Sequence, residues 1–294
     1  MLFFFNSLKK LELRENTCSL KKYLKINFKL IIIFLLSLLE ERNPKGCTQC
    51  FCFGQTQQCR TSDLFVGSHR DMDASEWQLA YAIRNASVSD IKAARNEDFN
   101  LKFDDSNQAK LSEPIYWSAS SSYLGNKVTS YGAAIKYNIQ INAPSSNSGA
   151  SGSGGGSTIR PDIILVGRDM NLMHTSIRQP APNEPFSNQI DLLEGQFSHF
   201  DTGSSVTREQ FMLVLSNLVE IKLRATYYNS LHESELINFE FDVGQSYDPV
   251  TANKAALSVE QCYCPPNYRG YSCESCEEGY YKVNCVIHFF VFFV

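Results

Sequence analysis

The sequence has no cysteine over the 202 residues from Arg60 to Gln261, although it contains ten cysteines in all. Five precede this stretch and five follow it: Cys18, Cys47, Cys50, Cys52 and Cys59, then Cys262, Cys264, Cys273, Cys276 and Cys285. This gap excludes a small fold held together throughout by disulfides. It predicts instead a cysteine-free domain with one half of a cysteine-rich unit on each side.

An excess of charge of one sign is also lacking. The chain has 27 Lys and Arg against 31 Asp and Glu, a formal net charge of −4. No basic field is available to hold a phosphate backbone, so we exclude nucleic acid as a partner. The hydrophobic fraction of 43% and the charged fraction of 20% are ordinary for a globular protein, and 294 residues can bury a sizeable core.

Long hydrophobic runs are limited to Leu30–Leu39, which Ser37 interrupts. As a helix, ten residues span about 15 Å, half of a bilayer core, so we expect no membrane-spanning helix there. The run suits a signal-peptide core, but Glu40–Arg42 follow where cleavage needs small residues. We expect residues 1–46 to be signal-like, or the edge of a fragment or gene prediction, and the apolar tail 286–294 to be atypical in the same way.

Motifs for catalysis and metal binding are absent. The five histidines stand in unrelated contexts, without HExxH or another metal-ligand spacing. The adjacent carboxylates Asp104-Asp105 and Glu277-Glu278 would diverge in an extended chain, and no nucleophile elbow or phosphate-binding glycine loop is found. We therefore expect no enzyme activity, no catalytic or metal site, no cofactor and no small-molecule substrate.

Between the two groups of cysteines the dominant hydrophobic period is two. Apolar and polar residues alternate over 135–141, 221–227 and 237–241, a pattern typical of strands with one buried face. Asp162–Gly167 holds a continuous apolar strand. Many short strands separated by Pro, Gly, Asn and Asp predict a mainly β fold for residues 60–261, an antiparallel, jelly-roll-like β-sandwich.

One segment departs from this period. Thr207-Arg-Glu-Gln210 matches a helix capping box, and apolar residues follow at helical spacing: Phe211, Val214, Leu215 and Leu218. We predict one short helix of about three turns, which ends near 217–220 and leads into a strand from Ile221.

Two segments carry candidate sites for sugars. Asn85-Ala-Ser87 is an N-glycosylation acceptor, usable in a secreted chain. The segment Ser145–Ser157 is nearly all Ser and Gly, which predicts a flexible surface loop. Within it Ser151 and Ser153, each followed by glycine, are weaker candidates for glycosaminoglycan attachment, because no acidic residues flank them.

Eight of the cysteines form an even set in loops rich in turn-forming residues, and 105 pairings of eight cysteines are possible. The alternative is a zinc site of two C-x-x-C pairs, formed by Cys47 with Cys50 and Cys273 with Cys276. Zinc would leave five other cysteines as loose thiols, so disulfides are favoured. The set is Cys50, Cys52, Cys59, Cys262, Cys264, Cys273, Cys276 and Cys285.

These residues resemble a known family. The sequence CPPNYRGYSCESCEEGYY over 264–281 resembles the second half of a laminin-type EGF-like module, and CFCFG over 50–54, continued to Cys59, resembles the first half. The segment between them is similar to the laminin IV type A domain, which in that family is inserted in such a module. That likeness rests on residues 116–132, 161–167 and 207–227. The resemblance implies module halves over 47–59 and 262–285, with the sandwich over 60–261.

The same resemblance implies a disulfide pairing and a function. The implied pairs are Cys50–Cys59, Cys52–Cys262, Cys264–Cys273 and Cys276–Cys285, whereas Cys47 looks like the last cysteine of a preceding module and Cys18 matches nothing. The implied function is that of a non-catalytic module of a secreted basement membrane glycoprotein, a perlecan-like proteoglycan or a laminin chain. Such a module supports matrix assembly, cell adhesion and tissue architecture through other matrix proteins or cell-surface receptors. The alternative is a carbohydrate-binding sandwich that would use some of the 14 tyrosines.

Overall fold

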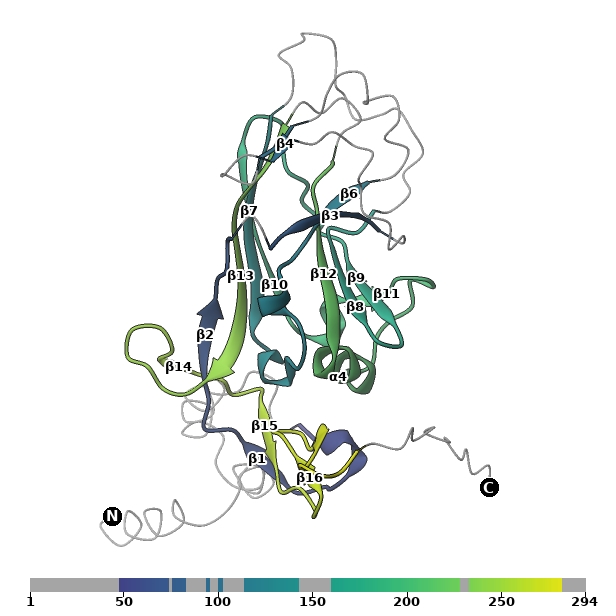
Figure 1. Cartoon of the computed structure of the whole chain (residues 1–294), viewed down its shortest axis with the longest axis vertical. Coiled ribbons are helices and arrows are strands. Elements are labelled where there is room, and N and C mark those ends of the chain that lie inside the picture. Colours follow the sequence, from purple (N-terminus) through teal and green to yellow (C-terminus); the bar gives the residue numbers. More distant parts are fainter. Residues whose placement is uncertain are drawn as a thin grey trace, which may run out of the picture.

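The computed structural model describes residues 48–73, 76–82, 94–95, 100–102, 114–142, 160–227 and 233–281 (Figure 1). Asn85, Ser151, Ser153, Cys18, Cys47, Cys285 and the two atypical ends, 1–46 and 286–294, lie outside these segments, so the expectations for them stay predictions. None of the helices in the described segments is long and apolar enough to cross a membrane.

One antiparallel sheet has the order β10-β7-β13-β2-β14, and a short ribbon of β5 and β4 extends from β13. The inward residues of β7 are Ile135, Tyr137, Ile139 and Ile141, all fully buried, so the alternation predicted for this strand is confirmed. The strands are β2 (Phe65–His69), β4 (Ala94–Arg95), β5 (Asn100–Lys102), β7 (Ala134–Asn142), β10 (Pro185–Asp191), β13 (Glu233–Gln245) and β14 (Lys254–Ala255).

A second antiparallel sheet has the order β11-β9-β8-β12-β6-β3. The predicted apolar strand appears as β8, which lies between β9 and β12. The strands are β3 (Gln78–Tyr81), β6 (Ile115–Ser118), β8 (Ile163–Gly167), β9 (Asn171–His174), β11 (Ser198–His199) and β12 (Leu218–Arg224).

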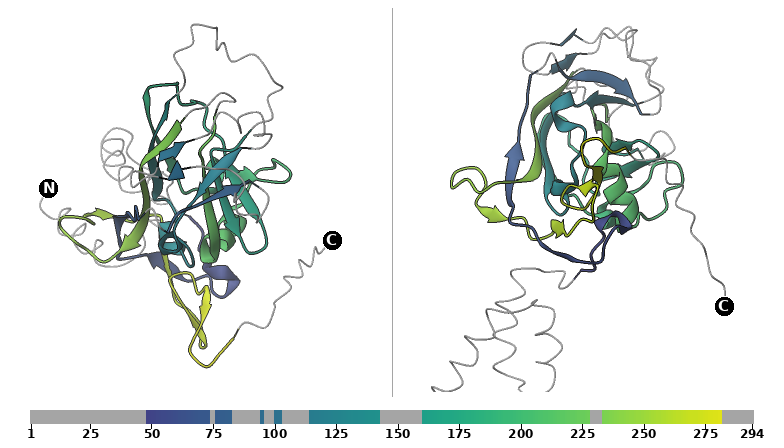
Figure 2. Two further views of the ribbon diagram at one scale, coloured as in Figure 1. Left: turned by 45° about the horizontal axis from the view of Figure 1, so that its top comes forward. Right: turned by 60° about the horizontal axis from the view of Figure 1, so that its bottom comes forward.

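The two sheets face each other and enclose one main core (Figures 1 and 2). Its centre includes three large rings, Trp77, Tyr123 and Phe239, which meet edge to face with centroids 5.1 to 5.8 Å apart. The hydroxyl of Tyr123 is also satisfied, because it accepts the amide N–H of Asp71 at 2.6 Å. The predicted mainly β, antiparallel sandwich is therefore confirmed.

The predicted helix is α4 (Arg208–Ser216), the α-helix of the described segments. Its capping box is formed as expected: the Thr207 hydroxyl accepts the N–H of Gln210, and the Gln210 side chain accepts the N–H of Thr207 at 3.0 Å. The helix ends at the near edge of the expected range, with Asn217 as its C-cap, but the helical position expected for Leu218 was wrong, because β12 begins there and not at Ile221. Leu218 exchanges two backbone hydrogen bonds with Gly125, at 2.8 and 2.9 Å, and these hold the chain extended there.

Replacement of Thr207 by alanine is expected to lower the free energy of unfolding by about 1 kcal/mol, because the N–H of Gln210 loses its acceptor. Urea denaturation of the full chain measures this difference. Thr175→Ala, at an exposed threonine just after β9, is the matched control and should stay within about 0.5 kcal/mol. An equal loss in both variants would mean that the cap contributes nothing specific.

Short elements complete the described segments. The 3-10 turns are η1 (Cys52–Gly54), η3 (Ser121–Tyr123), η4 (Val128–Ser130) and η5 (Glu194–Gln196). At the end of the sandwich where α4 lies, β1 (Cys59–Thr61) pairs with β15 (Glu260–Cys262), and β16 (Tyr268–Arg269) pairs with β17 (Ser275–Cys276). Figure 1 shows this group below the two sheets, so the cysteine-rich residues from both ends of the described chain gather at one end of the sandwich.

Candidate functional site at the domain junction

The chain enters and leaves the sandwich through two adjacent strands. In the antiparallel pair of β1 and β15, Cys59 lies opposite Cys262 and Thr61 opposite Glu260. The amide of Ser62 continues the ladder with a 2.9 Å hydrogen bond to the carbonyl of Val259. Segments about 200 residues apart in sequence are thus side by side, which positions every other contact at this junction.

Three disulfides link the cysteine-rich residues: Cys50–Cys59, Cys52–Cys262 and Cys264–Cys273. They are three of the four pairs that the resemblance implies. The bond between Cys52 and Cys262 closes a loop of 210 residues, and its two cysteines are 0% and 9% exposed. Cys276 is a free, half-buried thiol in the structure. Its expected partner, Cys285, lies outside the described residues, so the fourth pair stays a prediction.

Two groups of side chains at the junction are compact enough to suggest a metal site, one formed by Cys50, Cys52 and Cys59, the other by Cys52, Glu260 and Cys262. In both groups every sulfur belongs to a disulfide, whereas metal binding needs thiolates. The alternative zinc site meets the same difficulty, because Cys50 and Cys273 are bonded to other cysteines. The donor set of the oxidised unit does not fit zinc.

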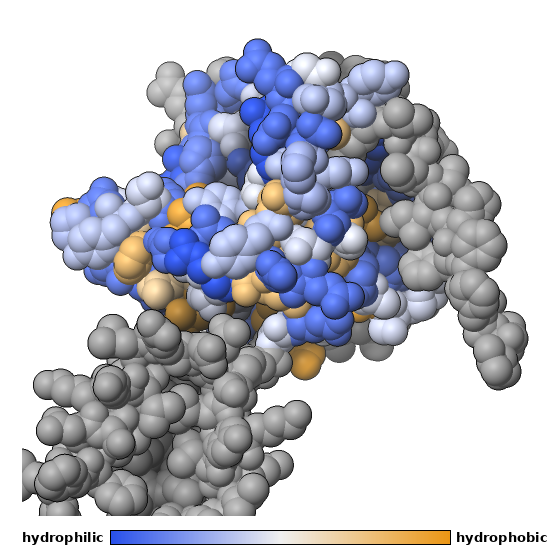
Figure 3. Space-filling view, turned by 90° about the horizontal axis from the view of Figure 1, so that it is seen from below, coloured by the Kyte–Doolittle hydropathy of each residue, from blue (hydrophilic) through white to orange (hydrophobic). Residues whose placement is uncertain are grey.

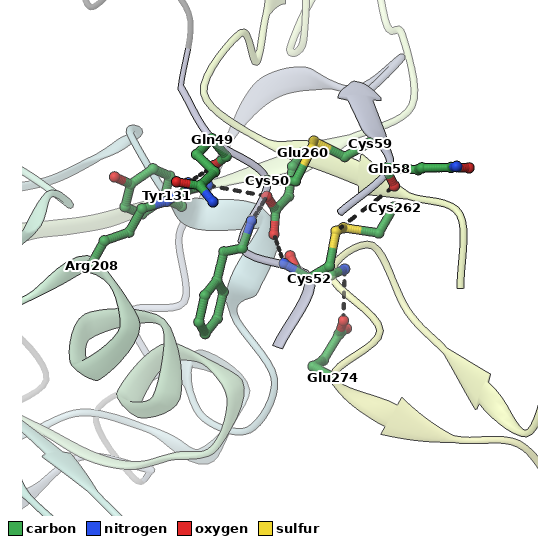
Figure 4. Close-up of polar contacts among 12 residues, drawn as sticks. Gln49, Cys50, Cys52, Gln58, Cys59, Tyr131, Arg208, Glu260, Cys262 and Glu274 are labelled. Atoms are coloured by element: carbon green, nitrogen blue, oxygen red, sulfur yellow. Dashed lines mark hydrogen bonds and ion pairs between the residues drawn. A yellow bond between two sulfur atoms is a disulfide. The ribbon is translucent and has the colours of Figure 1, made fainter. Parts of the chain in front are cut away.

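Glu260, the first residue of β15, makes polar contacts between the strand that leaves the sandwich and the first half of the unit (Figure 4). Its carboxylate accepts the backbone N–H groups of Phe51 at 2.8 Å and of Cys52 at 2.9 Å. The side chain is only 7% exposed. Because Glu260 lies two residues before Cys262, one carboxylate holds the first half of the unit in place beside the strand that carries the long-range disulfide.

Arg208 connects the same carboxylate to the sandwich. It is the first residue of α4, and its guanidinium donates to Glu260 at 3.2 Å and to the backbone carbonyl of Gln49. The guanidinium also lies 5.2 Å from the ring centre of Tyr131, a cation–π contact. Burial, followed by the hydrogen bond to Glu194, raises the pKa of the Tyr131 hydroxyl, which therefore stays neutral.

The backbone of the first half is strained where it meets the sandwich. Cys52, Phe53 and Gly54 have φ values of +43°, +47° and +73°, so two non-glycine residues lie in the left-handed region. This turn lets the Cys52 sulfur reach Cys262, while the rings of Phe51 and Phe53, 4.7 Å apart, pack against the sandwich core. The disulfide, the Glu260 contacts and the ring packing together hold the strained turn.

The second half of the unit makes its own contacts with the sandwich. The side-chain amide of Asn126 donates to the carboxylate of Glu274 at 2.7 Å, and Glu274 also accepts the N–H of Ser272 at 2.9 Å. Within this half the amide of Cys262 donates to the carbonyl of Tyr271 at 2.7 Å. Each half therefore meets the sandwich at a buried carboxylate, Glu260 for the first half and Glu274 for the second. Sequence analysis missed Glu260, Arg208, Asn126 and Glu274, since no local motif marks them.

The structure brings a serine, a histidine and an aspartate together elsewhere, but in an arrangement unsuited to catalysis. The hydroxyl of Ser122 donates to Asp71 at 2.7 Å and lies 3.0 Å from His69 Nε2. In acyl transfer the carboxylate must orient the imidazole, whereas here it binds the serine itself. Hydrogen bonds from Ser122 and Ser120 hold the pKa of Asp71 below its usual value. Burial, followed by the charge of Lys127, lowers the pKa of His69.

Exposed tyrosines do not gather on the faces of the sandwich in the described residues. The four exposed ones are Tyr247, on the loop after β13, and Tyr263, Tyr280 and Tyr281, in the second half of the unit. An open crevice of about 420 Å³ at the edge of the sandwich is lined by His174 to Arg178, Asn188, Gly195 and Gln196, without a tyrosine. Seen from the junction end, hydrophilic residues predominate on the coloured surface, with smaller hydrophobic areas between them (Figure 3).

Comparison with known proteins gives consistent results. The family model for Laminin B (Domain IV) matches residues 116–260, and the one for the laminin EGF domain matches residues 251–286. The Drosophila melanogaster laminin subunit alpha is 31% identical over 257 residues, which cover 83% of this chain and 6% of that protein. The mouse basement membrane-specific heparan sulfate proteoglycan core protein is 32% identical over 248 residues, 83% of this chain and 6% of that protein.

The Caenorhabditis elegans basement membrane proteoglycan is 30% identical over 251 residues, 82% of this chain and 7% of that protein. Among solved structures, the L4b domain of human laminin alpha-2 matches with a TM-score of 0.49 and 18% identity, over 62% of this chain and 99% of that chain. The chain thus spans 6% to 7% of the length of these full-length relatives. It carries a laminin domain IV followed by a laminin EGF domain, and it is related to the laminin alpha chains and the basement membrane proteoglycans.

Proposed function

We propose that this chain is a non-catalytic structural module of a secreted basement membrane protein. In this role it presents the β-sandwich (residues 60–261) sideways from a laminin EGF-like unit whose halves are residues 47–59 and 262–285. The observation that carries the proposal is the junction: β1 and β15 pair, and Cys52 is bonded to Cys262, so the sandwich enters and leaves at one point. A domain held in this way is an insertion in the cysteine-rich unit, and we take that unit to be one link in a rod of such units.

Three further observations support the proposal. Disulfides persist in oxidising compartments, and the structure has three of them at the junction. The relatives named above are a laminin chain and basement membrane proteoglycans. In the cluster of Ser122, His69 and Asp71 the carboxylate accepts a hydrogen bond from the serine and does not orient the imidazole. This arrangement supports a structural role for the cluster and the proposed absence of enzyme activity. Partners of this chain would be other matrix components or cell-surface receptors, and Asn85 would carry an N-linked glycan.

The test is deposition in matrix. The full chain, secreted from animal cells that lay down a basement membrane, is expected to concentrate in the insoluble matrix relative to the medium. Non-reducing peptide mapping of the same material should find a peptide that joins Cys52 to Cys262, and added mass at Asn85. An unrelated secreted β-sandwich of similar size is the control. Enrichment no greater than that of the control, or free thiols at all eight cysteines of the unit, would contradict the proposal.

A further inference from the structure

We infer that the cysteine-rich unit carries tension past the β-sandwich, so that the sandwich stays folded while the rod is pulled. The inference rests on the proposed function, because it takes the unit to be one link in an extracellular chain under load. It adds a mechanical role to the disulfide between Cys52 and Cys262, which otherwise only stabilises the fold.

The covalent path through the unit is short. From Thr48 the chain reaches Cys52, crosses to Cys262, continues to Cys264, crosses again to Cys273 and runs on towards Tyr281. This path holds about 17 residues, which can span at most about 60 Å when fully extended. The 210-residue loop that contains the sandwich branches off the path at Cys52 and rejoins it at Cys262, so tension along the path does not stretch it.

The hydrogen-bonded pair of β1 and β15, through which the chain enters and leaves the sandwich, also lies outside the path. The ladder of β1 and β15 begins beyond the crossover, at Cys59 on one strand, and leads into the sandwich. The disulfide from Cys50 to Cys59 does not open a second route, because the chain after Cys59 returns to the path only at Cys262. Hydrogen bonds with Glu260 and Arg208 hold residues 49–52 of the path against the sandwich. These contacts lie beside the path, so the tension does not pass through the two sheets.

The disulfide at the crossover is protected against reduction. Cys52 is fully buried and Cys262 is 9% exposed, so an attacking thiolate has little access to either sulfur. A carboxylate oxygen of Glu260 lies within 4.8 Å of both sulfurs, and its negative charge opposes the approach of a thiolate. In the second crossover Cys264 is half-buried and Cys273 fully buried, and the bond closes just nine residues.

Single-molecule stretching of the full chain, held by handles at its two ends, tests the inference. Cys52→Ser with Cys262→Ser is expected to release about 700 Å more contour length than the wild type, because about 200 residues, from Cys59 to Cys262, then enter the path, while the remaining Cys50–Cys59 bond keeps residues 51–58 out of it. Cys264→Ser with Cys273→Ser is the matched control and should add only about 30 Å, the length of nine residues. The terminal segments contribute equally to all three chains and cancel in the differences.

If the first variant does not fold, the wild type itself supplies the test: under constant load, the step of about 700 Å should appear only after a small dithiol is added. The inference is overturned if the wild type releases this length without reductant while peptide mapping shows Cys52 joined to Cys262. The two experiments can contradict the proposed function and the mechanical role independently of each other. A chain that fails to enter matrix but keeps its length under load contradicts only the proposed function, and the reverse result contradicts only the mechanical role.

Discussion

Replacing Cys52 and Cys262 together by serine is expected to lower the free energy of unfolding of the sandwich by about 5 kcal/mol. The bond closes a 210-residue loop, and without it the unfolded chain regains the entropy that the closure removes. Both cysteines are replaced at once so that no single thiol is left to attack the neighbouring disulfides. Urea denaturation of the secreted protein measures the difference, and the expected fall in melting temperature is about 10 to 20 °C.

Cys264→Ser with Cys273→Ser is the control for this prediction as well. Its bond closes nine residues outside the sandwich, so the same reasoning gives about 2.5 kcal/mol, confined to the second half of the unit. The urea midpoint and the melting temperature of the sandwich should therefore fall far less in this control than in the variant without Cys52 and Cys262. A loss below about 1 kcal/mol for the Cys52 and Cys262 pair would mean that chain entropy does not govern this bond, and that the β1–β15 pair alone holds the ends of the sandwich.

The local elements of the sandwich were predictable because their signals are local. The alternation over 135–141 corresponds to β7, and the Thr207 capping box to the start of α4. The end of α4 was not predictable in the same way. Leu218 continues the helical spacing, but it pairs with Gly125, more than 90 residues earlier in the sequence, and becomes a strand residue.

Alternation was also misleading in β12, where a half-buried strand was expected. Lys222 and Arg224 take the polar positions of the pattern, yet they are only 3% and 7% exposed. Lys222 is satisfied by the carbonyl of Tyr81 at 2.9 Å and by Glu220 at 3.2 Å. Arg224 lies 4.0 Å from Asp162 and 4.3 Å from the ring centre of Tyr227. Both faces of this strand are therefore buried from Ile221 to Arg224, because backbone carbonyls, carboxylates and a ring contact its charges there.

The junction shows the same limit more clearly. The spacing of the cysteines, read through the family resemblance, implied the bonds that the structure contains. The polar contacts around those bonds join residues 52, 148 and more than 200 positions apart, as in Arg208 with Glu260, Asn126 with Glu274 and Glu260 with Phe51. Each of these contacts exists only because the fold places α4 and the loop that carries Asn126 against the cysteine-rich unit. A long-range polar contact produces neither a hydrophobic period nor a characteristic residue spacing, so the sequence alone does not reveal it.

The second large effect is expected at Glu260. Glu260→Ala should lower the free energy of unfolding by about 3 to 5 kcal/mol, because it leaves the guanidinium of Arg208, with only 15% of its side chain exposed, without its carboxylate. It also leaves the N–H groups of Phe51 and Cys52 without an acceptor. Glu260→Gln keeps one side-chain oxygen at a similar position, so it should lower the free energy of unfolding by less than Glu260→Ala. Urea denaturation compares these variants with the wild type.

The Arg60–Asp63 ion pair is the matched control, since its guanidinium and carboxylate are even closer, at 2.7 Å against 3.2 Å for Arg208 and Glu260, but its side chains are 47% and 75% exposed. Asp63→Ala should therefore cost less than about 1 kcal/mol. Arg208→Ala completes a double-mutant cycle with Glu260→Ala, and the two losses should not add, because the groups share one contact. If Glu260→Ala is no more destabilising than Asp63→Ala, or if the cycle is additive, Glu260 does not tie the unit to the sandwich. In that case the disulfides and the packing of Phe51 and Phe53 alone must hold the strained turn.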